Sequence, residues 1–292
     1  MSKRQRIGLH YATKIKLTGF LFILPVLMYF GILSFFPILS AFFYSFFEYN
    51  IFSEGVFVGV RNYVAIFSSP QFLNSLKATL IYTLGYCVIV FIVAFGLALL
   101  LKRSFPLRNT FQFVFFMPLV ISLVVISITW YAMFIPSGLV NTILGTKKID
   151  WLTSTKLAIW VVILLSVWKW SGFYMIVFLS GLNAIPEQYY DAAKIDGAGD
   201  FASFRLITLP LLKPTITFVL VISMIGSVKV IEPMYIITKG GPVDSTRVLA
   251  LRIYEEAFKN FNMGRASAMS VVLFLIILIL TLLQFRLVDI KE

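Results

Sequence analysis

Cysteine, histidine and acidic side chains are all scarce in this chain of 292 residues. The single cysteine, Cys87, excludes a disulfide within the chain, and together with the single histidine, His10, it argues against a zinc or haem site. A membrane enzyme would need clusters of carboxylate, histidine or cysteine side chains, so these two lone residues also argue against that class. We therefore expect no metal, no cofactor and no catalytic residue.

Sequence patterns that hold nucleotides are missing as well. No G-x-x-x-x-G-K-[ST] pattern occurs, so the chain has no P-loop with which to bind ATP. Residues 197–202 read GAGDFA and match the dinucleotide pattern G-x-G-x-x-A. No strand is expected before them and no βαβ unit around them, so we interpret the match as chance. If ATP drives this protein, its hydrolysis is expected on a separate subunit.

What the chain has instead is apolar surface, because 60% of its residues are hydrophobic and only 13% are charged. A soluble domain does not carry that composition, so the bilayer is the expected solvent. The formal net charge of +12 would suggest nucleic acid in a soluble protein. Here the basic residues lie mostly at the ends of apolar segments and at the termini, where lipid headgroups explain them and no nucleic-acid partner is expected.

Six apolar segments reach the length of about 20 residues that a membrane-spanning helix needs. The first follows five basic residues in 1–16, but it is far longer than the h-region of a signal peptide and no small-residue cleavage site follows it. We therefore predict an uncleaved first span, kinked at Pro25 and Pro37, and an all-α protein with six transmembrane helices in one membrane domain, 1–292. The predicted spans are 17–47, 78–101, 111–134, 157–182, 215–238 and 266–287.

The distribution of lysine and arginine predicts the orientation in the membrane. With the N-terminus inside, the inner segments carry thirteen bases and the outer segments ten. The early segments decide the assignment, because five bases precede the first span and three lie in the short segment 102–110. Both termini and the segment 183–214 are therefore expected in the cytoplasm.

The segment 183–214 is the longest polar interruption between two spans, and it carries four acids and three bases. A helix is predicted from Pro186, a residue suited to the first helical position, to Gly197, where glycine permits the left-handed turn that ends many helices. Asp200 is expected to cap a second helix that ends at Pro210 and Pro214. The segment therefore predicts two short helices joined by a glycine bend.

One face of the first predicted helix has almost no side-chain bulk. Ala192, Ala193 and Gly197 form it, flanked by Asp191 and Asp196. Such a surface suits insertion into a groove on another protein, and the alternative is a solvated amphipathic loop.

At these positions the loop resembles the EAA loop of the permease subunits of binding-protein-dependent ABC importers. The matching elements are D-A-A at 191–193, Gly197, Ile207 and L-P at 209–210, with the family's spacing throughout. Neighbouring residues and the T-K-G-G-P turn at 238–242 resemble the branch that imports sugars, oligosaccharides and glycerol phosphates. Within that branch, the turn is similar to that of the first-type, maltose-system larger permease.

The resemblance implies the type I ABC importer permease fold, with the loop docking as a coupling helix in a cleft of the ATPase. The leading Glu of the family is Asp191 here, whose carboxylate is one methylene shorter, so Glu187 one turn earlier is expected to share its contact. The residues with implied roles in ATPase coupling are Glu187, Asp191 and Asp196 for polar anchoring, and Ala192, Ala193 and Gly197 for close approach.

The resemblance also implies partners and a location. The chain is expected to pair with a second permease as a heterodimer, to dock two ATPase subunits with it, and to receive solute from an extracytoplasmic solute-binding protein. The location implied is the cytoplasmic (inner) membrane of a bacterium or archaeon, which the chain crosses several times.

Three ionisable side chains interrupt the predicted spans: Lys169 in the fourth, and Lys229 and Glu232 in the fifth. At such depth a charge is costly unless it is paired or wetted. Lys229 and Glu232 are three residues apart and can pair on one helix face, or Glu232 can reach Lys169 across helices. The alternative is that all three line a translocation pathway.

Two stripes of aromatic, hydroxyl and small residues are further pathway candidates. Aromatic faces with hydroxyl groups suit sugar rings, while the alternative is ordinary helix packing, in which small residues let helices approach closely. The stripes consist of Ser166, Trp170 and Phe173 in the fourth span, and Ser223, Gly226 and Ser227 in the fifth.

Taken together, these features predict a transport subunit and not an enzyme. It would form half of the pathway of an ATP-driven ABC importer for a sugar, an oligosaccharide or a related polyol phosphate. The alternative is a secondary transporter driven by an ion gradient, which should show inverted repeats and broken helices.

Overall fold

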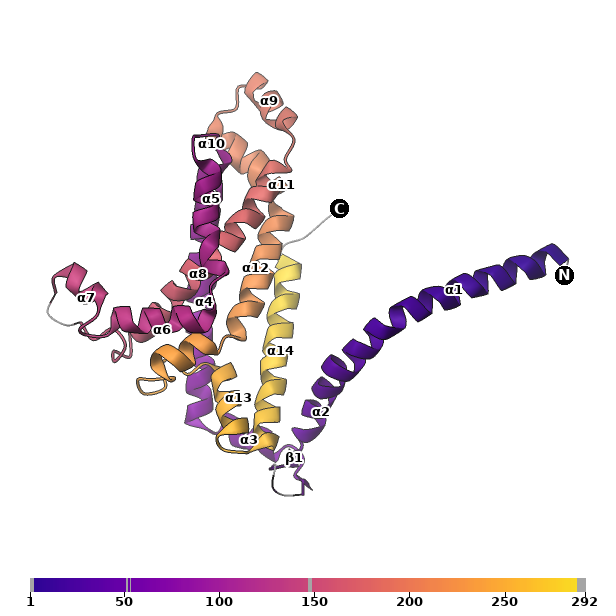
Figure 1. The fold of residues 1–292 in the computed structure, drawn as a ribbon, viewed down its shortest axis with the longest axis vertical. Helices are drawn as coiled ribbons and strands as arrows, with labels where there is room; N and C mark the ends of the chain where they lie inside the picture. Colours follow the sequence, from indigo (N-terminus) through magenta and orange to yellow (C-terminus); the bar gives the residue numbers. More distant parts are fainter. Residues whose placement is uncertain (1–2, 51, 53, 147–148, 288–292) are drawn as a thin grey trace.

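The structure is a computed structural model that describes residues 3–50, 52, 54–146 and 149–287. The described chain is built almost entirely of helices, most of them gathered into one tall bundle (Figure 1). One small hairpin, β1 (Phe47–Glu48) with β2 (Val56–Phe57), is the sheet within these residues. The helical fold follows from the apolar composition, because a helix satisfies its backbone hydrogen bonds internally in lipid.

Three long helices form the frame of the bundle. They are α4 (Pro70–Lys102), α8 (Ala158–Asn183) and α14 (Met263–Leu287). Pro70 is the first residue of α4, where its missing N–H is not needed. At 33 residues, α4 is about 50 Å long and extends beyond a hydrocarbon core of about 30 Å. Within the described residues, four helices are long and apolar enough to span a membrane, or up to six if each of two bent pairs counts as one span.

The packing of α4 against α8 forms the core of the molecule. Two thirds of the apolar window of α8 is buried, compared with 28% for α4 and for α14, so α8 is the central helix. On α4 the buried positions recur every four residues and include Val90, Ala94 and Ala98. In lipid, helices associate through close packing and not through the hydrophobic effect, which explains the small residues on this face.

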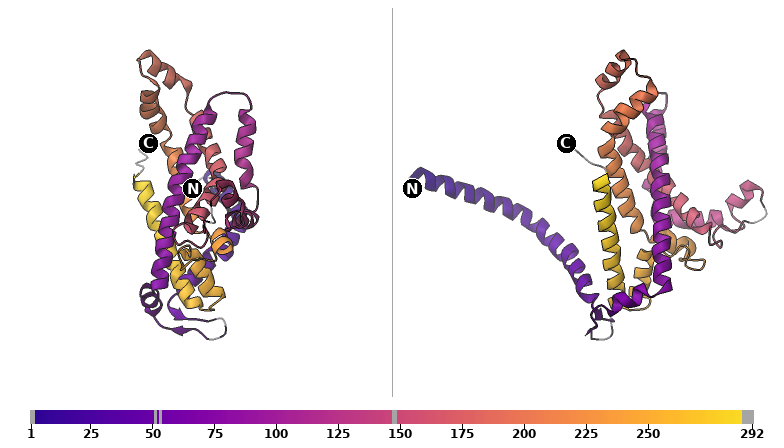
Figure 2. Two further views of the ribbon diagram at one scale, coloured as in Figure 1. Left: turned by 90° about the vertical axis from the view of Figure 1, so that its left-hand side faces the viewer. Right: turned by 180° about the vertical axis from the view of Figure 1, so that it is seen from behind.

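The N-terminal helices project away from this bundle (Figures 1 and 2). They are α1 (Lys3–Phe30), a π-helical turn, η1 (Gly31–Phe35), and α2 (Phe36–Tyr44). Their apolar side chains are mostly exposed. The sequence predicts one apolar helix to residue 47 with kinks at two prolines. The helix instead ends at Tyr44, Pro25 lies inside α1, and the irregular turn precedes Pro37, whose ring cannot supply the usual N–H donor.

The predicted third span is broken in the structure. It consists of α5 (Arg108–Phe116), the 3₁₀ turn η2 (Met117–Leu119) and α6 (Leu123–Phe134), with a bend of 92°. The apolar segment predicted as a span over 111–134 therefore consists of two helices with a bend between them, and it counts as one span only if the bent pair does. Pro118 lies within the 3₁₀ turn that ends the first part, and it lacks the N–H that an uninterrupted helix requires.

The predicted fifth span also departs from a single helix. Its regular part is α12 (Lys213–Val228), which is followed by three non-helical residues, 229–231. Two helical residues and then a π-helical turn, η4 (Met234–Thr238), come after them. Pro233 precedes that turn. The segment predicted as a span over 215–238 is therefore interrupted in its helical hydrogen bonding at residues 229–231, and Pro233 follows that interruption.

The loop between α8 and α12 holds α9 (Glu187–Ile195), α10 (Asp200–Ser203), η3 (Phe204–Thr208, π-helical) and α11 (Leu209–Leu211). Two expectations need correction. Asp200 is the first residue of α10 and makes no capping bond, because Gly199 occupies the N-cap position. Pro210 lies inside α11, where the preceding π-helical turn accommodates it, so it does not end the segment.

At the opposite end of the bundle lie α3 (Arg61–Phe67) and α13 (Leu249–Phe258), while α7 (Leu139–Leu144) projects to one side with α6 (Figure 1). The buried Asn62 donates to the carbonyl oxygens of Ser45 and Phe47, at 2.9 and 2.8 Å, and so ties α3 to the residues after α2.

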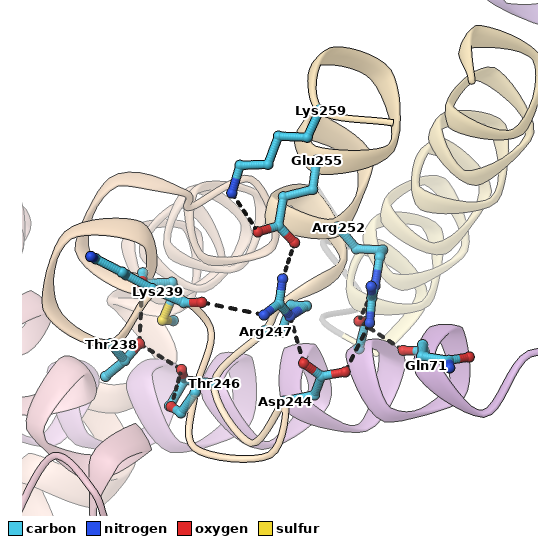
Figure 3. A network of polar contacts seen from close by, with 12 residues as sticks. Gln71, Thr238, Lys239, Asp244, Thr246, Arg247, Arg252, Glu255 and Lys259 are labelled. Carbon is cyan, nitrogen blue, oxygen red and sulfur yellow. Dashed lines mark hydrogen bonds and ion pairs between the residues drawn. The ribbon is translucent and has the colours of Figure 1, made fainter. Parts of the chain in front are cut away.

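A group of ion pairs fixes the chain between η4 and α13. We call it the Arg247 network, and Figure 3 shows it. Arg247 bonds to Asp244 at 2.6 Å and to Glu255, and Arg252 bonds to the second oxygen of Asp244 at 2.9 Å. Burial alone would lower the pKa of the Arg247 guanidinium, but the hydrogen bonds that it donates to Glu255 and Asp244, together with their negative charges, outweigh this effect, so the pKa is raised.

Candidate functional site

A cavity of about 390 Å³ lies inside the bundle between α4, α8 and α12. Its lining is mostly apolar and aromatic, with a few polar groups, which is the usual composition of a small-molecule site. Seven of the nine residues that the sequence nominates for a pathway line this cavity. They are Ser166, Trp170 and Phe173 on α8, Gly226 and Ser227 on α12, and Lys229 and Glu232 just after α12.

The other two nominated residues lie outside the lining. Ser223 is 1% exposed and donates its hydroxyl to the carbonyl of Leu220 at 3.1 Å, which is an ordinary bond within a helix. Lys169 is 5% exposed and directs its ammonium group to a different part of the molecule, the break between α5 and α6. Both residues are therefore buried among packed helices and do not line this cavity.

Three tyrosines of the cavity wall were not nominated from the sequence. Tyr82 and Tyr86 on α4 stack with ring centroids 5.8 Å apart, and Tyr174 on α8 lines the same cavity. The Tyr82 hydroxyl donates to the hydroxyl of Ser166 at 2.8 Å, a contact between residues 84 positions apart. The spacing of four between Tyr82 and Tyr86 was the available signal, but in a chain with 16% aromatic residues such pairs are common.

These side chains give the cavity a definite chemistry. Trp170 and Phe173 meet edge to face, with centroids 6.3 Å apart, and offer ring surfaces. The same lining includes three tyrosines and two serines, which carry hydroxyl groups. The arrangement suits a solute with apolar faces and hydroxyl groups at its rim.

The two charged residues of the cavity remain separate. Lys229 follows the last residue of α12 as its C-cap, where a cation interacts favourably with the helix dipole. Among the ion pairs of the described residues, none joins Lys229 to Glu232, and none joins Glu232 to Lys169. Both pairings suggested by the sequence are therefore absent there, and Lys229 and Glu232 are both exposed.

The second candidate site is α9, which forms the tip of the molecule at the end opposite β1 and α3 (Figure 1). Most of the residues nominated for docking are exposed on it and on the turn that follows, and Ala193 is half-buried. Among the described residues, Asp191 forms an ion pair with Lys194 alone, at 3.4 Å, and both side chains are about two-thirds exposed or more. Such a surface pair contributes little, so the Asp191 carboxylate is free to exchange partners.

Gly197 closes α9 in the way that the sequence predicts. Its φ is +78°, the N–H of Gly197 bonds to the carbonyl of Lys194 at 3.1 Å, and the N–H of Ala198 bonds to that of Ala193 at 2.8 Å. These two bonds make a Schellman motif, in which a left-handed glycine ends the helix. A Cβ built at Gly197 would meet no atom within 4 Å, so backbone conformation alone requires glycine within this chain.

One residue of α9 connects this tip to the bundle. The Tyr190 hydroxyl lies 2.9 Å from the Thr208 hydroxyl on η3 and accepts a hydrogen bond from the Lys102 ammonium at 3.2 Å. The same ammonium stands 4.4 Å from the centre of the Tyr190 ring. Tyr190 therefore joins α9 to the end of α4, a connection that the sequence did not reveal.

Comparison with known proteins gives consistent results. The family model described as "Binding-protein-dependent transport system inner membrane component" matches residues 89–290. The chain is 34% identical over 281 residues to the "Probable ABC transporter permease protein YesP" of Bacillus subtilis (strain 168), covering 94% of this chain and 91% of that protein. It is 31% identical over 276 residues to the "Trehalose/maltose transport system permease protein MalF" of Thermococcus litoralis, covering 92% of each.

A solved structure shares the fold. It is a bacterial ABC transporter involved in the import of the acidic polysaccharide alginate, and one of its chains superposes with a TM-score of 0.85. The match covers 98% of this chain and 100% of that one, at 24% identity. At this identity the likeness concerns the fold alone.

Proposed function

Because this chain belongs to the family of inner membrane components of binding-protein-dependent transport systems, we propose that it forms half of a sugar-conducting pathway driven by an ATPase bound at α9. The observation that carries the proposal is one continuous connection. A protruding helix with a bulk-free face is anchored through Tyr190 to α4, and α4 also supplies Tyr82 and Tyr86 to the central cavity.

The loop 183–214 is the proposed coupling element. Ala192, Ala193 and Gly197 allow the ATPase surface to approach the backbone of α9, while Asp191 and Asp196 supply polar contacts at its edge. Glu187 and Asp191 line one shared cavity of about 460 Å³ beside α9, which supports the idea that they share the contact made by a longer glutamate in the family.

The cavity between α4, α8 and α12 is the proposed solute pathway. Ring faces of Trp170 and Phe173 would stack on a sugar, and Ser166 and Ser227 would bond to its hydroxyl groups. The proposed substrate is a sugar, an oligosaccharide or a related polyol phosphate, which the mainly apolar lining with hydroxyl edges supports. The Lys229 ammonium group would form an ion pair with any anionic group that such a solute carries.

The proposed assembly contains a second permease, two ATPase subunits and a solute-binding protein. The exposed apolar helices α1 and α2 support the second permease, since together with lipid it would cover them. The binding protein would deliver solute at the end opposite α9. We place both termini and α9 in the cytoplasm, as the distribution of basic residues predicts, and treat 1–292 as one transmembrane domain.

The proposed mechanism is a rigid-body switch. Closure of the ATPases on ATP would draw the coupling loops together, and the connection through Tyr190 would transmit that movement to α4 and the cavity wall. The broken helices that the sequence argument associated with secondary transporters occur in this structure. Family membership assigns the chain to ABC importers, so broken helices do not distinguish the two classes.

The proposal is tested with two glycines of one loop. Gly197→Ala places a Cβ at φ +78° and costs about 1–2 kcal/mol of backbone strain. Gly199→Ala is the matched control, because its φ is −73° and a Cβ there also meets no atom. In the reconstituted complex with its binding protein, Gly197→Ala is expected to weaken ATPase association and ATP-dependent uptake of labelled sugars by about tenfold. Gly197→Trp is expected to abolish both while the subunit still inserts.

Two outcomes would contradict the proposal. If Gly197→Trp bound the ATPase and moved solute as the wild type does, the loop 183–214 would not be the coupling element. Uptake by the wild-type chain without any ATPase, driven by an imposed ion gradient, would restore the secondary-transporter alternative.

A further inference from the structure

The break between α5 and α6 leaves backbone carbonyl groups where a helix would normally satisfy them. Residues 120–122 connect η2 to α6 at the 92° bend. A carbonyl group in hydrocarbon needs a donor, because no water replaces the missing helical bond. This segment therefore needs donors from another part of the protein.

Lys169 supplies those donors. Its ammonium group lies 2.6 Å from the carbonyl oxygen of Ile121, 3.2 Å from that of Leu119 and 3.3 Å from that of Pro118. An ammonium group has three N–H donors, so three carbonyl acceptors match its full capacity. The positive charge also stands at the C-terminal end of the α5–η2 segment, where the helix dipole is negative.

A second observation places α8 unusually close to the same segment. Gly172, three residues after Lys169 on α8, lies against the backbone of Phe115 and Phe116. A Cβ at Gly172 would overlap the carbonyl oxygen of Phe115, so no larger residue fits without a shift of the backbone. Lys169 and Gly172 thus form two adjacent contacts between α8 and the broken helix.

This pair of contacts also bears on the central cavity. Leu123, the first residue of α6, forms part of the cavity wall, and it lies two residues after Ile121, the last residue whose carbonyl Lys169 binds. Trp170, next to Lys169, lines the cavity from α8. Lys169, which lies outside the cavity, therefore holds the start of α6 in a fixed position relative to α8, and both helices contribute to the cavity wall.

We propose that Lys169 is a positioning residue that clamps the α5–α6 break to α8, so that Leu123 and the α8 face of the cavity move as one body. That the cavity is a transport pathway rests on the proposed function, but the clamp itself does not. In this arrangement the ammonium group of Lys169 binds backbone carbonyl oxygens and takes no part in binding solute.

The test measures the reactivity of single cysteines in the assembled transporter in lipid vesicles, with Cys87 replaced by alanine. Leu123→Cys reports on the clamped segment. Ile222→Cys reports on the same cavity from α12, whereas the hydrogen bonds recorded for Lys169 go to residues 118, 119 and 121. A small neutral methanethiosulfonate is the probe. Lys169→Met is expected to change the labelling rate at 123 by about tenfold, the effect of losing one or two net hydrogen bonds, while the rate at 222 stays within about twofold.

Three further variants make the test decisive. Lys169→Arg keeps the charge and the donors, so it should restore the wild-type rate at 123. Lys156→Met removes an exposed lysine before the same helix and should leave both rates unchanged. If Lys169→Met does not insert, Lys169→Gln, which keeps two donors without charge, replaces it with the same expected direction.

The result that overturns the proposal is equally specific. Equal changes at 123 and 222 would mean that Lys169 supports the whole bundle and not this segment. An unchanged rate at 123 in both the Met and the Gln variants would mean that the segment holds its position without the clamp. These rates do not depend on any solute, so a failure here is separate from a failure of the transport proposal.

Discussion

Removing the hydroxyl of Tyr190 tests how movement of α9 reaches the cavity. Tyr190→Phe deletes one oxygen and keeps the ring. It removes the contacts with the Thr208 hydroxyl at 2.9 Å and with the Lys102 ammonium at 3.2 Å. The stacking of the Lys102 ammonium over the ring, at 4.4 Å from its centre, remains.

The magnitude follows from the contacts that are lost. Both are partly buried, and each contributes about 1 kcal/mol net, so the attachment of α9 to α4 and η3 weakens by about 2 kcal/mol. The population of a detached α9 then rises by about thirtyfold. The docking face itself keeps all its atoms, because Tyr190 is not one of the small or acidic residues that form it.

The assay separates docking from transmission. In the reconstituted complex, Tyr190→Phe is expected to retain ATPase binding and ATP hydrolysis, while the amount of solute moved per ATP falls. Tyr189→Phe is the matched control. It removes the same hydroxyl group from the neighbouring residue, whose side chain is 53% exposed. Equal transport per ATP in the two variants would refute the reasoning, as would a loss of ATPase binding confined to Tyr190→Phe.

Two further predictions concern the end of the bundle opposite α9. Arg247→Met leaves the carboxylates of the Arg247 network without their main partner and should destabilise the folded protein by about 2–3 kcal/mol in a thermal unfolding assay in detergent; Arg265→Met, whose pair spans 4.0 Å, should change it little. Gly264→Ala forces a Cβ into the carbonyl of Phe47 and should speed protease cleavage near that residue, whereas Gly96→Ala, with no atom near its Cβ, should not.

The sequence was sufficient where the structural cause is local. Pro70 begins α4 because its own ring suits a helix start, and Gly197 ends α9 because its own backbone adopts φ +78°. The helical fold in lipid follows from composition alone. The family resemblance rested on the spacing within residues 191–210, which also lies within one short stretch of chain.

Local rules were also misleading in places. They predicted a capping role for Asp200, but α10 begins one residue earlier than that role requires. Asp200 is its first residue, and Gly199 is the N-cap. They gave the third and fifth spans as single apolar segments and did not reveal the interruptions, although Pro118 lies in the first and Pro233 follows the second. Hydropathy measures the solvent that a segment prefers, and it does not measure whether the backbone ladder within that segment is unbroken.

For the cavity, composition identified the residue types, and the tertiary structure decided which of them meet. Seven nominated residues line it, but Tyr82 reaches Ser166 across 84 positions of sequence. The sequence left two ion-pair partners open for Glu232, and the structure records neither. Side chains on different helices come together only through helix packing, which no short window of sequence encodes.

Lys169 shows the division most clearly. By itself, the sequence determined that a lysine at this depth needs partners, because an uncompensated charge in a bilayer is costly. Only the tertiary structure decided that those partners are the backbone carbonyls of Pro118, Leu119 and Ile121, about 50 positions away. Those acceptors exist because another helix breaks there, so the partner of Lys169 is a consequence of the fold and not of any side chain that the sequence could name.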